Sequence, residues 1–567
     1  MATLGIGKTL FNSSACYLNE NVTWPEIVLT ERISRKKASG AWPEQALEYF
    51  KKKYELNNIP IGENRDVEDP AEIEQALNSQ FPFFEYLKQK NLQIFSRHFN
   101  QNIHWITHHR AHAYAAQFMS PFSKSLILVI DGAGSRENAF QPHHAEFKFI
   151  PDSIDRLRAE ERTAYLLDKG QLTCIDKKWQ TFTKSKTHPN HHFSEGLGSF
   201  YEKISEYIFN SKRSAGKVMG LAAFSNTHHN VVNSLDYLEN LNWSLQFKGQ
   251  SKQSWESTPH MQTFCDVAAT AQNYFEENLI SYVKKLAGRY PEYRNLIITG
   301  GCALNCTTNM KLFDLKLFDE IYVPPFPGDE SISLGVAVGL QPKEFLLTKP
   351  TISHDLQQGY FGPTSSVPCD DELKKVFQDY TIEQPQSITD LATELLLNGQ
   401  ILGWFQGRSE SGPRALGHRS ILARPDKKGL KNTLNTNVKF RESFRPYGCS
   451  VLHEKASLYF NVPYGFNNPF MSFAVKVNIE YRKLLAEVMH IDGTSRMQTV
   501  QNQQCPIFYE LIKKFGDKSG LYCLLNTSLN IMSEPIVETI QDAKNFLDHA
   551  PVDGLIIQNF YIKKIHK

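Results

Sequence analysis

The sequence predicts an α/β protein, and two patterns support this. Short apolar runs rich in β-branched residues alternate along the chain with longer segments of helical apolar spacing. Several of these runs end in glycine-containing turns, as strands do where a sheet delivers a loop to a site. The longest compact apolar run, LILVI at 126–130, is far shorter than the roughly 18–20 residues that a membrane span requires. We therefore expect a buried strand there and no membrane insertion.

The first half contains three expected strands, each a β-branched run that closes in a turn. These strands are expected at residues 125–131, 295–299 and 320–324. Helices are expected where apolar residues recur every three or four positions. They cover residues 199–208, 267–286 and 331–340.

A change of composition divides the chain. Residues 341–366 are rich in Pro, Thr, Ser, Gln and Gly, so we expect a linker near 345–358 and two domains, 1–350 and 351–567. The second domain repeats the α/β pattern. Its expected helices are 371–380, 388–398 and 540–549, and its expected strands are 401–405, 522–525 and 554–558. No internal sequence repeat is evident.

The amino-acid composition excludes several classes of protein. The 62 Lys and Arg residues nearly balance 60 Asp and Glu residues, which gives no case for general nucleic-acid binding. Nine scattered cysteines without a CxxC pair argue against a disulfide framework or a thiolate zinc site. The first twenty residues lack a basic stretch followed by an apolar one, so we expect no signal peptide. A reducing cytoplasm is the expected location.

Two histidines and two aspartates form a candidate metal site. His108 and His112 are four residues apart in an alanine-rich stretch, so a helix would project both rings from one face. This spacing alone is weak, because histidine pairs without a metal are commoner. Asp131 closes an apolar strand and Asp329 lies in a PGDE turn, where capping the next helix is its alternative role. Together they would suit Fe(II), Zn(II) or Mn(II).

Positive charge is concentrated early in the second domain. Residues 401–450 contain ten Lys or Arg against three acids, and the segment 403–425 is arginine-rich and interrupted by glycines. A solvated basic face is the simpler interpretation. Arginine, however, keeps its charge when partly buried and offers a planar fork to phosphate or carboxylate. We therefore expect a pocket for polyanions.

Two glycine-centred segments lie in the first half, RSAGKVMGLAAF at 213–224 and TGGCALN at 299–305. Glycines after a strand let backbone N–H groups approach an anion closely. Asn305 would contact a ribose or phosphate, or cap the following helix. Neither segment has the spacing of a P-loop or of GxGxxG.

Taken together, the motifs resemble the NodU/CmcH family of O-carbamoyltransferases, in the family's order and over nearly the whole chain. The motifs that carry the resemblance are HHRAHAYAAQF with SPF, VIDGAG, GKVMGLA, TGGCALN, PGDE, GPRALGHRSILA, NVKFRESFRP, DGTSRMQTV and LNTSLNIMSEPIV. The resemblance implies an ASKHA-type, metal-binding N-terminal domain and a YrdC-like C-terminal domain. It also suggests a homodimer.

The implied activity has two steps. The C-terminal domain would make carbamoyl-adenylate from carbamoyl phosphate and ATP with Mg²⁺, and the N-terminal domain would transfer the carbamoyl group to a hydroxyl of a sugar-containing or secondary-metabolite acceptor. A carbamoyl carbon is a poor electrophile because its nitrogen donates into it, so AMP as leaving group helps. Fixed cations would offset the repulsion between the anionic reactants.

The resemblance also assigns residues. The implied cationic and catalytic groups of the second domain are Arg414, Lys439, Arg445 and Arg496, with Asn526 and Ser528 as hydrogen-bond partners of the nucleotide or carbamoyl group. In the first domain it implies that His108, His112, Asp131 and Asp329 bind the metal, usually iron, and that Lys37 faces the adenylate. Gly216, Lys217 and Asn305 would help to hold the nucleotide. His109 is our candidate for the base that accepts the hydroxyl proton.

The sequence departs from the family pattern in three places. The usual His-Asp pair of the first hairpin is replaced by the segment FNSS at 11–14, Gly448-Cys449 follows FRP, and Glu330-Ser331 follows PGD. The first departure puts acceptor contacts at that edge in doubt.

Four other functions fit less well. A helical metalloprotease needs HExxH, where this chain has HHRAH. Hydrogenase-maturation carbamoyltransferases carry CxxC zinc fingers, and tRNA threonylcarbamoylation would need a nucleic-acid surface. A non-catalytic sugar- or nucleotide-binding protein would leave the proposed metal ligands without a role.

Overall fold

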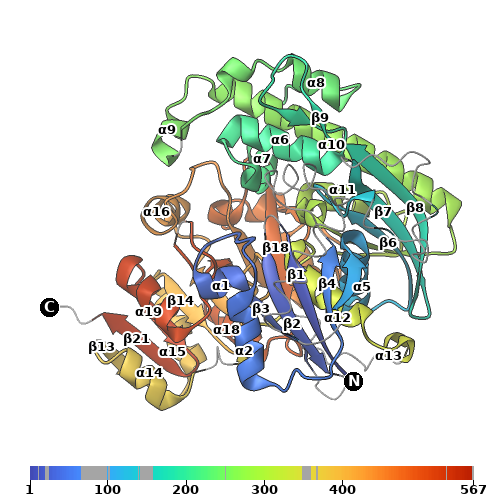
Figure 1. Ribbon diagram of the computed structural model, residues 1–567. Coiled ribbons are helices and arrows are strands. Elements are labelled where there is room, and N and C mark those ends of the chain that lie inside the picture. The colour runs from blue at the N-terminus through green and yellow to red at the C-terminus, as the bar shows by residue number, and fades with distance from the viewer. Residues whose placement is uncertain are drawn as a thin grey trace.

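The computed structural model confirms a mixed α/β protein built on three large sheets (Figure 1). It describes residues 1–9, 12–19, 24–65, 99, 103–137, 140, 148, 158–249, 251–347, 359–364, 368–531 and 533–564. In those ranges, no helix combines the length and apolar character needed to cross a membrane. The domain boundary expected at 350 lies outside the described residues.

The first sheet has five strands in the order β3-β2-β1-β4-β5. Its strands are β1 (Ala2–Lys8), β2 (Ser13–Asn19), β3 (Glu26–Leu29), β4 (Ile61–Arg65) and β5 (Ile103–Thr107). The first three pair antiparallel in sequence, and β4 and β5 add in parallel beside β1.

The second sheet repeats this topology in the order β12-β11-β6-β7-β8. Its strands are β6 (Lys124–Ile130), β7 (Arg158–Asp168), β8 (Gln171–Thr181), β11 (Asn295–Thr299) and β12 (Glu320–Tyr322). Again three antiparallel strands come first and two parallel strands follow on the other side of the first. The two sheets therefore share one strand order, and that the first half is ASKHA-type stays a prediction.

Two helices lie between these sheets and set the position of the candidate site. Helix α12 (Ile332–Gly339) packs on β1, β2 and β4, and α5 (His108–Met119) packs on α12 and on β6. The helices touch closely at Gly335, where an added Cβ would lie 1.8 Å from the carbonyl oxygen of Ala111. Any side chain at this position would therefore force α5 and α12 apart.

The far side of the second sheet is covered by helices, several of which form the top of the molecule in Figure 1. They are α6 (Leu197–Phe209), α7 (Ala215–Ala222), α8 (Ser234–Asn240), α9 (Lys252–Glu256), α10 (Met261–Arg289) and α11 (Cys306–Asp314). Buried residues of β6 and β11 share one apolar core with α6 and α10.

The second half is built on a nine-stranded sheet in the order β13-β21-β20-β14-β15-β19-β16-β18-β17. Its strands are β13 (Tyr380–Glu383), β14 (Leu402–Phe405), β15 (Arg419–Ala423), β16 (Gly448–Leu452), β17 (Ala474–Lys476), β18 (Thr494–Val500), β19 (Cys523–Ser528), β20 (Gly554–Ile557) and β21 (Phe560–Lys564). The main helices are α15 (Ile388–Leu397), α18 (Pro506–Ser519) and α19 (Ile540–His549). That this half is YrdC-like stays a prediction.

Two boundary predictions are corrected. The helix expected at 371–380 is α14 (Asp370–Val376), because the chain turns before β13 begins at Tyr380. The expected linker begins later than 345, since α13 (Lys343–Leu347) extends the helical region. Residues 348–358 lie outside the described part.

The two halves are joined by partly buried hydrogen bonds. Arg408 donates one to the carbonyl oxygen of Pro25 in the first half, at 2.9 Å, and another to the carbonyl oxygen of Phe361 in its own half, at 3.0 Å. Arg35, just after α1 (Thr30–Ser34), donates to the carbonyl oxygens of Pro535 and Ile536. The segment after α1 therefore lies directly against the second half.

Candidate functional site

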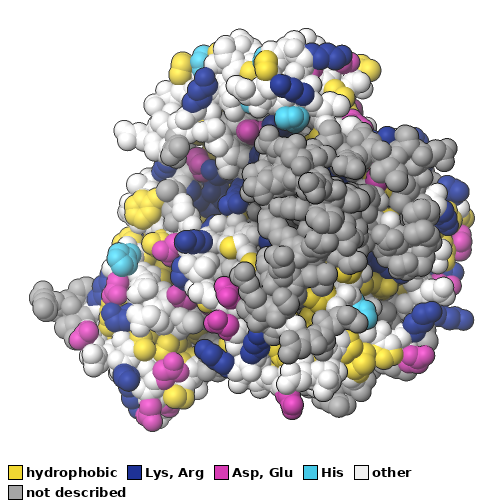
Figure 2. All heavy atoms as spheres, in the orientation of Figure 1, with side chains coloured by type: hydrophobic (Ala, Val, Ile, Leu, Met, Phe, Trp, Pro, Cys, Tyr) yellow, Lys and Arg dark blue, Asp and Glu magenta, His cyan; other side chains and the backbone are white. Residues whose placement is uncertain are grey.

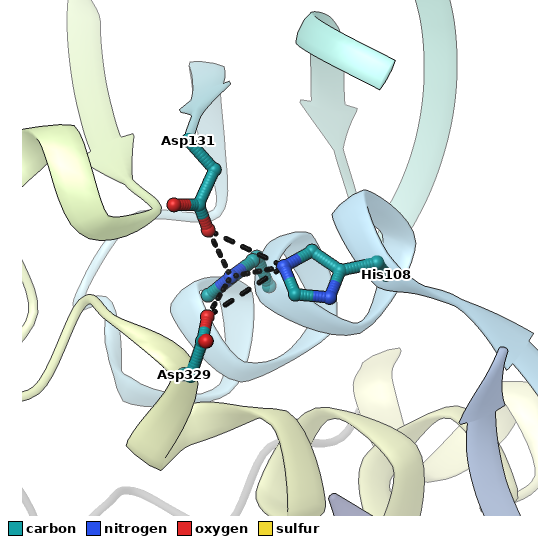
Figure 3. A group of neighbouring side chains, drawn as sticks. His108, Asp131 and Asp329 are labelled. Atoms are coloured by element: carbon teal, nitrogen blue, oxygen red, sulfur yellow. Dashed lines mark hydrogen bonds and ion pairs between the residues drawn. The ribbon is translucent and has the colours of Figure 1, made fainter. Parts of the chain in front are cut away.

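The four predicted metal ligands meet at one point, where α5, the end of β6 and the turn before α12 converge (Figure 3). One possible ligand atom from each of His108, His112, Asp131 and Asp329 lies within 4.8 Å of the other three. The Nε2 atoms of the two histidines are 3.2 Å apart, and they lie 3.3 and 3.1 Å from one oxygen of Asp131. Both are 3.6 Å from an oxygen of Asp329.

These separations fit a divalent metal. Ligands about 2.0–2.1 Å from a tetrahedral ion are roughly 3.3–3.4 Å from one another. Neighbouring groups hold the ligands in orientation, as metal sites require. Ser331 Oγ donates its hydrogen to the carbonyl oxygen of Gly328. It can therefore accept a hydrogen bond from Nδ1 of His112, at 3.2 Å. Because Nδ1 then carries the proton, Nε2 of His112 is the atom that can bind a metal. Thr9 donates to the outer oxygen of Asp329 at 2.6 Å. Asp329 therefore serves the cluster and does not cap α12.

The metal cluster opens into a first cavity of about 370 Å³ that extends to the second half of the protein. Asp131 and Asp329 form one end, while Lys37 and Ser528 also line it. Burial and, to a smaller extent, the nearby Asp131 raise the pKa of Glu202, another lining residue, to about 8. Residues from both halves thus share one chamber.

A second cavity, also about 370 Å³, lies across α7 from the first. Three arginines line it, Arg441, Arg445 and Arg496, together with Lys217. Figure 2 shows Lys and Arg side chains gathered in a recess on the drawn face, below the upper helices. The cavities adjoin because Gly216 and Met219 of α7 line both.

Several Lys and Arg side chains around these cavities repel one another, and this repulsion lowers their pKa values. Burial lowers the pKa of Lys439 well below its ordinary value, and Arg441, Lys37 and Arg445 lower it further. Burial likewise lowers the pKa of Lys37, although Glu31 opposes this. The pKa of Arg441 falls to about 10 through burial and through Arg445. Such mutual repulsion in a buried place favours anionic ligands.

Most residues predicted to bind the reactants lie at these cavities. Lys439 is an exception, because it lines neither cavity; its Nζ donates to the carbonyl oxygen of Asn530 and to its side-chain oxygen, at 3.0 and 2.6 Å, and also to Ser528, both of which line the first cavity. Gly216 lines both cavities, and Lys217 pairs with Glu442 at 2.6 Å across the two halves.

The capping role predicted for Asn305 is confirmed, and its contact with a ribose or phosphate stays a prediction. Asn305 lines the first cavity, and its side-chain oxygen also caps α11 by accepting a hydrogen bond from the backbone N–H of Thr308 at 3.2 Å.

The structure corrects three predicted roles. Arg414 donates to the carbonyl oxygens of Phe470, Met471 and Leu304, so it braces the two halves and does not line either cavity. Asn526 is buried inside the sheet, where its amide donates to the oxygens of three neighbouring residues.

The geometry also fails to support His109 as the base for the transfer step. Its ring is fully buried against Thr163, at 2.8 Å, and lines neither cavity. Burial lowers its pKa to about 3, so it would be a very weak base.

Sequence reasoning missed three residues of the site. Arg32 lines the first cavity with only 2 % of its side chain exposed, and its Nε and Nη1 make no hydrogen bond. Arg441 stands in the NVKFRESFRP motif, and its charge beside Lys439 and Arg445 could have indicated a role in the site. Nothing in the sequence could have indicated Glu202, because a single glutamate on an amphipathic helix is ordinary.

Family models match both halves of the chain. The carbamoyltransferase N-terminus model matches residues 77–339, and the carbamoyltransferase C-terminus model matches residues 393–564. A relative, nodulation protein NolO of Bradyrhizobium diazoefficiens, is 32% identical over 81% of this chain and 79% of its own length. The chain belongs to the carbamoyltransferase family.

Other carbamoyltransferase relatives extend this comparison. Nodulation protein NolNO of Sinorhizobium fredii is 32% identical over 82% of this chain, which spans 64% of that longer protein. Nodulation protein U of Rhizobium tropici is 33% identical over 47% of this chain and 44% of its own. Similarity to these relatives confirms the resemblance to the NodU/CmcH family that the motifs predict.

Likeness to solved structures is weak. Component A of (R)-2-hydroxyglutaryl-CoA dehydratase from Acidaminococcus fermentans gives a TM-score of 0.33 at 12% identity, covering 61% of this chain and 99% of that one. Full-length HypF in its phosphate- and nucleotide-bound form gives 0.30 at 14%, covering 61% and 47%. Scores this low assign neither fold nor function.

Proposed function

We propose that this carbamoyltransferase is an ATP-dependent O-carbamoyltransferase that uses carbamoyl phosphate as donor. It makes carbamoyl-adenylate among the cations of the second half and then carbamoylates a hydroxyl in the first cavity. The acceptor is a sugar-containing compound or secondary metabolite. The observation that carries the proposal is the adjacency of a buried cation cluster and a His₂Asp₂ cluster across α7.

In the first step, water converts carbamoyl phosphate into carbamate and phosphate. A carbamate oxygen then attacks the α-phosphorus of ATP, and the bond to pyrophosphate breaks. Every reactant is an anion, so the step needs fixed cations to lower the repulsion between them. Arg441, Arg445 and Arg496 line the second cavity and are placed to bind the phosphates. Lys37 lines the first cavity and is placed to bind the carbamate end. Mg²⁺ accompanies ATP.

The second step takes place near the metal cluster. The hydroxyl oxygen attacks the carbamoyl carbon, AMP leaves, and the hydroxyl proton is released. His108, His112, Asp131 and Asp329 would hold Fe²⁺ or another divalent metal, which supplies Lewis-acid polarisation of the carbamoyl group when bound. The Nε and Nη1 atoms of Arg32 make no hydrogen bond, although they lie 3.5 and 3.7 Å from carboxylate oxygens of Glu31 and Glu538. Arg32 is therefore placed to bind the AMP phosphate as it departs.

The acceptor enters by the first cavity. Asn12 lies in the segment FNSS that replaces the family's His-Asp pair, and its side-chain oxygen is buried in the cavity lining without a hydrogen-bond partner. An acceptor hydroxyl would satisfy it. The homodimer and the cytoplasmic location stay predictions.

The reaction products test this proposal. We expect purified protein given ATP, carbamoyl phosphate and Mg²⁺ to release phosphate and pyrophosphate, detected by ³¹P NMR, and to release AMP once an acceptor is added. ADP with no pyrophosphate would contradict the adenylate route. Mass spectrometry of candidate acceptors would then identify the one that gains a carbamoyl group.

A further inference from the structure

Helix α5 carries two of the four metal ligands but lacks a cap of its own. Its N-cap residue, Thr107, makes no side-chain hydrogen bond to the helix. The first backbone N–H groups of a helix have no partner within it, so they must bond elsewhere when buried. Because the first of these groups belongs to His108, their partners also determine where that ligand lies.

Two side chains distant in sequence supply these partners. Ser135 Oγ accepts a hydrogen bond from the backbone N–H of His108 at 2.9 Å. Glu160, on β7, accepts one from the backbone N–H of His109 at 3.3 Å. The same oxygen of Glu160 accepts from the backbone N–H of Ser135 at 2.9 Å. Glu160 thus holds the start of α5 and the loop after β6 at once.

That loop begins with the third ligand, Asp131. Between Asp131 and Ser135, Gly134 packs so tightly that an added Cβ would lie 2.6 Å from Glu160 and 2.8 Å from the ring of His109. The backbone N–H of Gly134 also donates to the carbonyl of Glu160 at 3.0 Å. Glu160 therefore holds in place both the histidines of α5 and the loop that begins with Asp131.

Glu160 is itself firmly placed. Its side chain is fully buried, and its second oxygen contacts Lys177, which is equally buried. The ion pair keeps the carboxylate charged in the interior, and a negative charge at a helix N-terminus is favourable. Neither Glu160 nor Lys177 lines either cavity, so neither has a direct role in binding reactants.

We propose that Glu160 is a positioning residue of the metal centre, which fixes the start of α5 against the Asp131 loop so that the histidines and Asp131 converge before a metal binds. This inference rests on the proposed function, because it assumes that the four residues bind a metal. It predicts that Glu160 affects metal affinity although it touches no metal.

Co²⁺ titration of the full-length protein, followed by visible absorption, tests the inference. We expect Glu160→Gln to weaken Co²⁺ binding about 10- to 100-fold with one ion still bound, as loss of groups that orient metal ligands does. The bands of the bound Co²⁺ should also change, since the ligands lose their fixed orientation. Ser135→Ala, which removes only the cap of His108, should weaken binding less.

The matched control is Glu161→Gln. Glu161 is the next residue on β7 and is equally buried, but its carboxylate contacts Lys178, Arg162 and the backbone N–H of Leu197. This variant should keep wild-type Co²⁺ affinity and bands.

Three outcomes would overturn the inference, and they are distinguishable. A folded Glu160→Gln variant with wild-type affinity and bands would show that Glu160 does not position the ligands. Should this variant fail to fold, wild-type behaviour of Ser135→Ala would reject the capping argument. A wild-type protein that binds no Co²⁺ would contradict both this inference and the metal site of the proposed function.

Discussion

The two cavities beside α7 differ in their charged groups. The first is mixed: its lining includes Asp131 and Asp329 of the His₂Asp₂ cluster and a buried glutamate whose pKa is raised, together with four Lys or Arg residues. The second is mainly cationic, lined by three arginines and two lysines against two carboxylates. An arginine-lined space suits the gathering of anions, whereas a His₂Asp₂ cluster suits a metal that activates an electrophile. The comparison indicates that the arginines and the His₂Asp₂ cluster belong to separate spaces that share one helix.

The largest effect is expected from Arg496→Ala, which removes a cation of the second cavity. We expect pyrophosphate release to fall about 100- to 1,000-fold, because the anionic reactants lose a fixed charge. Co²⁺ binding should not change. Arg482→Ala, at an exposed position of the same half, is the control and should keep the wild-type rate. Equal loss in both variants would mean that general charge, and not the cavity, matters.

Removal of the metal should have an effect confined to the first cavity. We expect dialysis against a chelator, followed by assay with Mg²⁺, to abolish carbamoyl transfer and spare pyrophosphate release, and addition of Fe²⁺ should restore transfer. Loss of both activities would argue that the metal cluster also serves the first step.

A smaller change should follow Glu442→Gln. Glu442 pairs with Lys217 at 2.6 Å and lies 3.6 Å from Arg445, so it competes with anions for both cations. We expect pyrophosphate to bind about two- to fivefold more tightly, in line with the modest energy of such pairs. Calorimetric titration measures this, with Glu480→Gln as the exposed control. Weaker binding would show instead that Glu442 orients Lys217.

The smallest expected effect is the change with pH in the stability of the empty protein and in its affinity for pyrophosphate. The pKa of Lys439 lies below its ordinary 10.5, so in the empty protein this lysine loses its proton before an unfolded chain would. Between the lowered pKa and 10.5 the unfolded state binds more protons, so stability of the empty protein rises with pH. Affinity for pyrophosphate should fall over the same window, since only the protonated lysine attracts it. A flat affinity profile would contradict this.

The sequence predicted that His108, His112, Asp131 and Asp329 lie together because each of them carries a local signal. His108 and His112 have helical spacing, Asp131 follows a strand and Asp329 lies in a glycine turn. Their convergence, however, depends on the contact of α5 with α12, which single-sequence patterns do not show. The duplicated strand order was invisible for the same reason: it resides in backbone pairing and leaves no sequence repeat.

The errors have the same origin. Asn526 and Ser528 point to one face of β19, but only Ser528, at the strand end, reaches a cavity, while Asn526 bonds within the sheet. Arg32 stands in the charged stretch TERISRKK, which is typical of an exposed helix. Its burial comes from the second half packing over α1, where it donates to the carbonyl oxygen of Gly412 at 3.0 Å. Local patterns could not reveal contacts across hundreds of residues.

The separation of the two steps is tested most directly by a single comparison of two products in His112→Ala. With ATP, carbamoyl phosphate, Mg²⁺ and an acceptor identified by mass spectrometry, we expect this variant to release pyrophosphate at the wild-type rate and to form no carbamoylated acceptor. Parallel loss of pyrophosphate release and transfer would contradict the assignment of one step to each cavity.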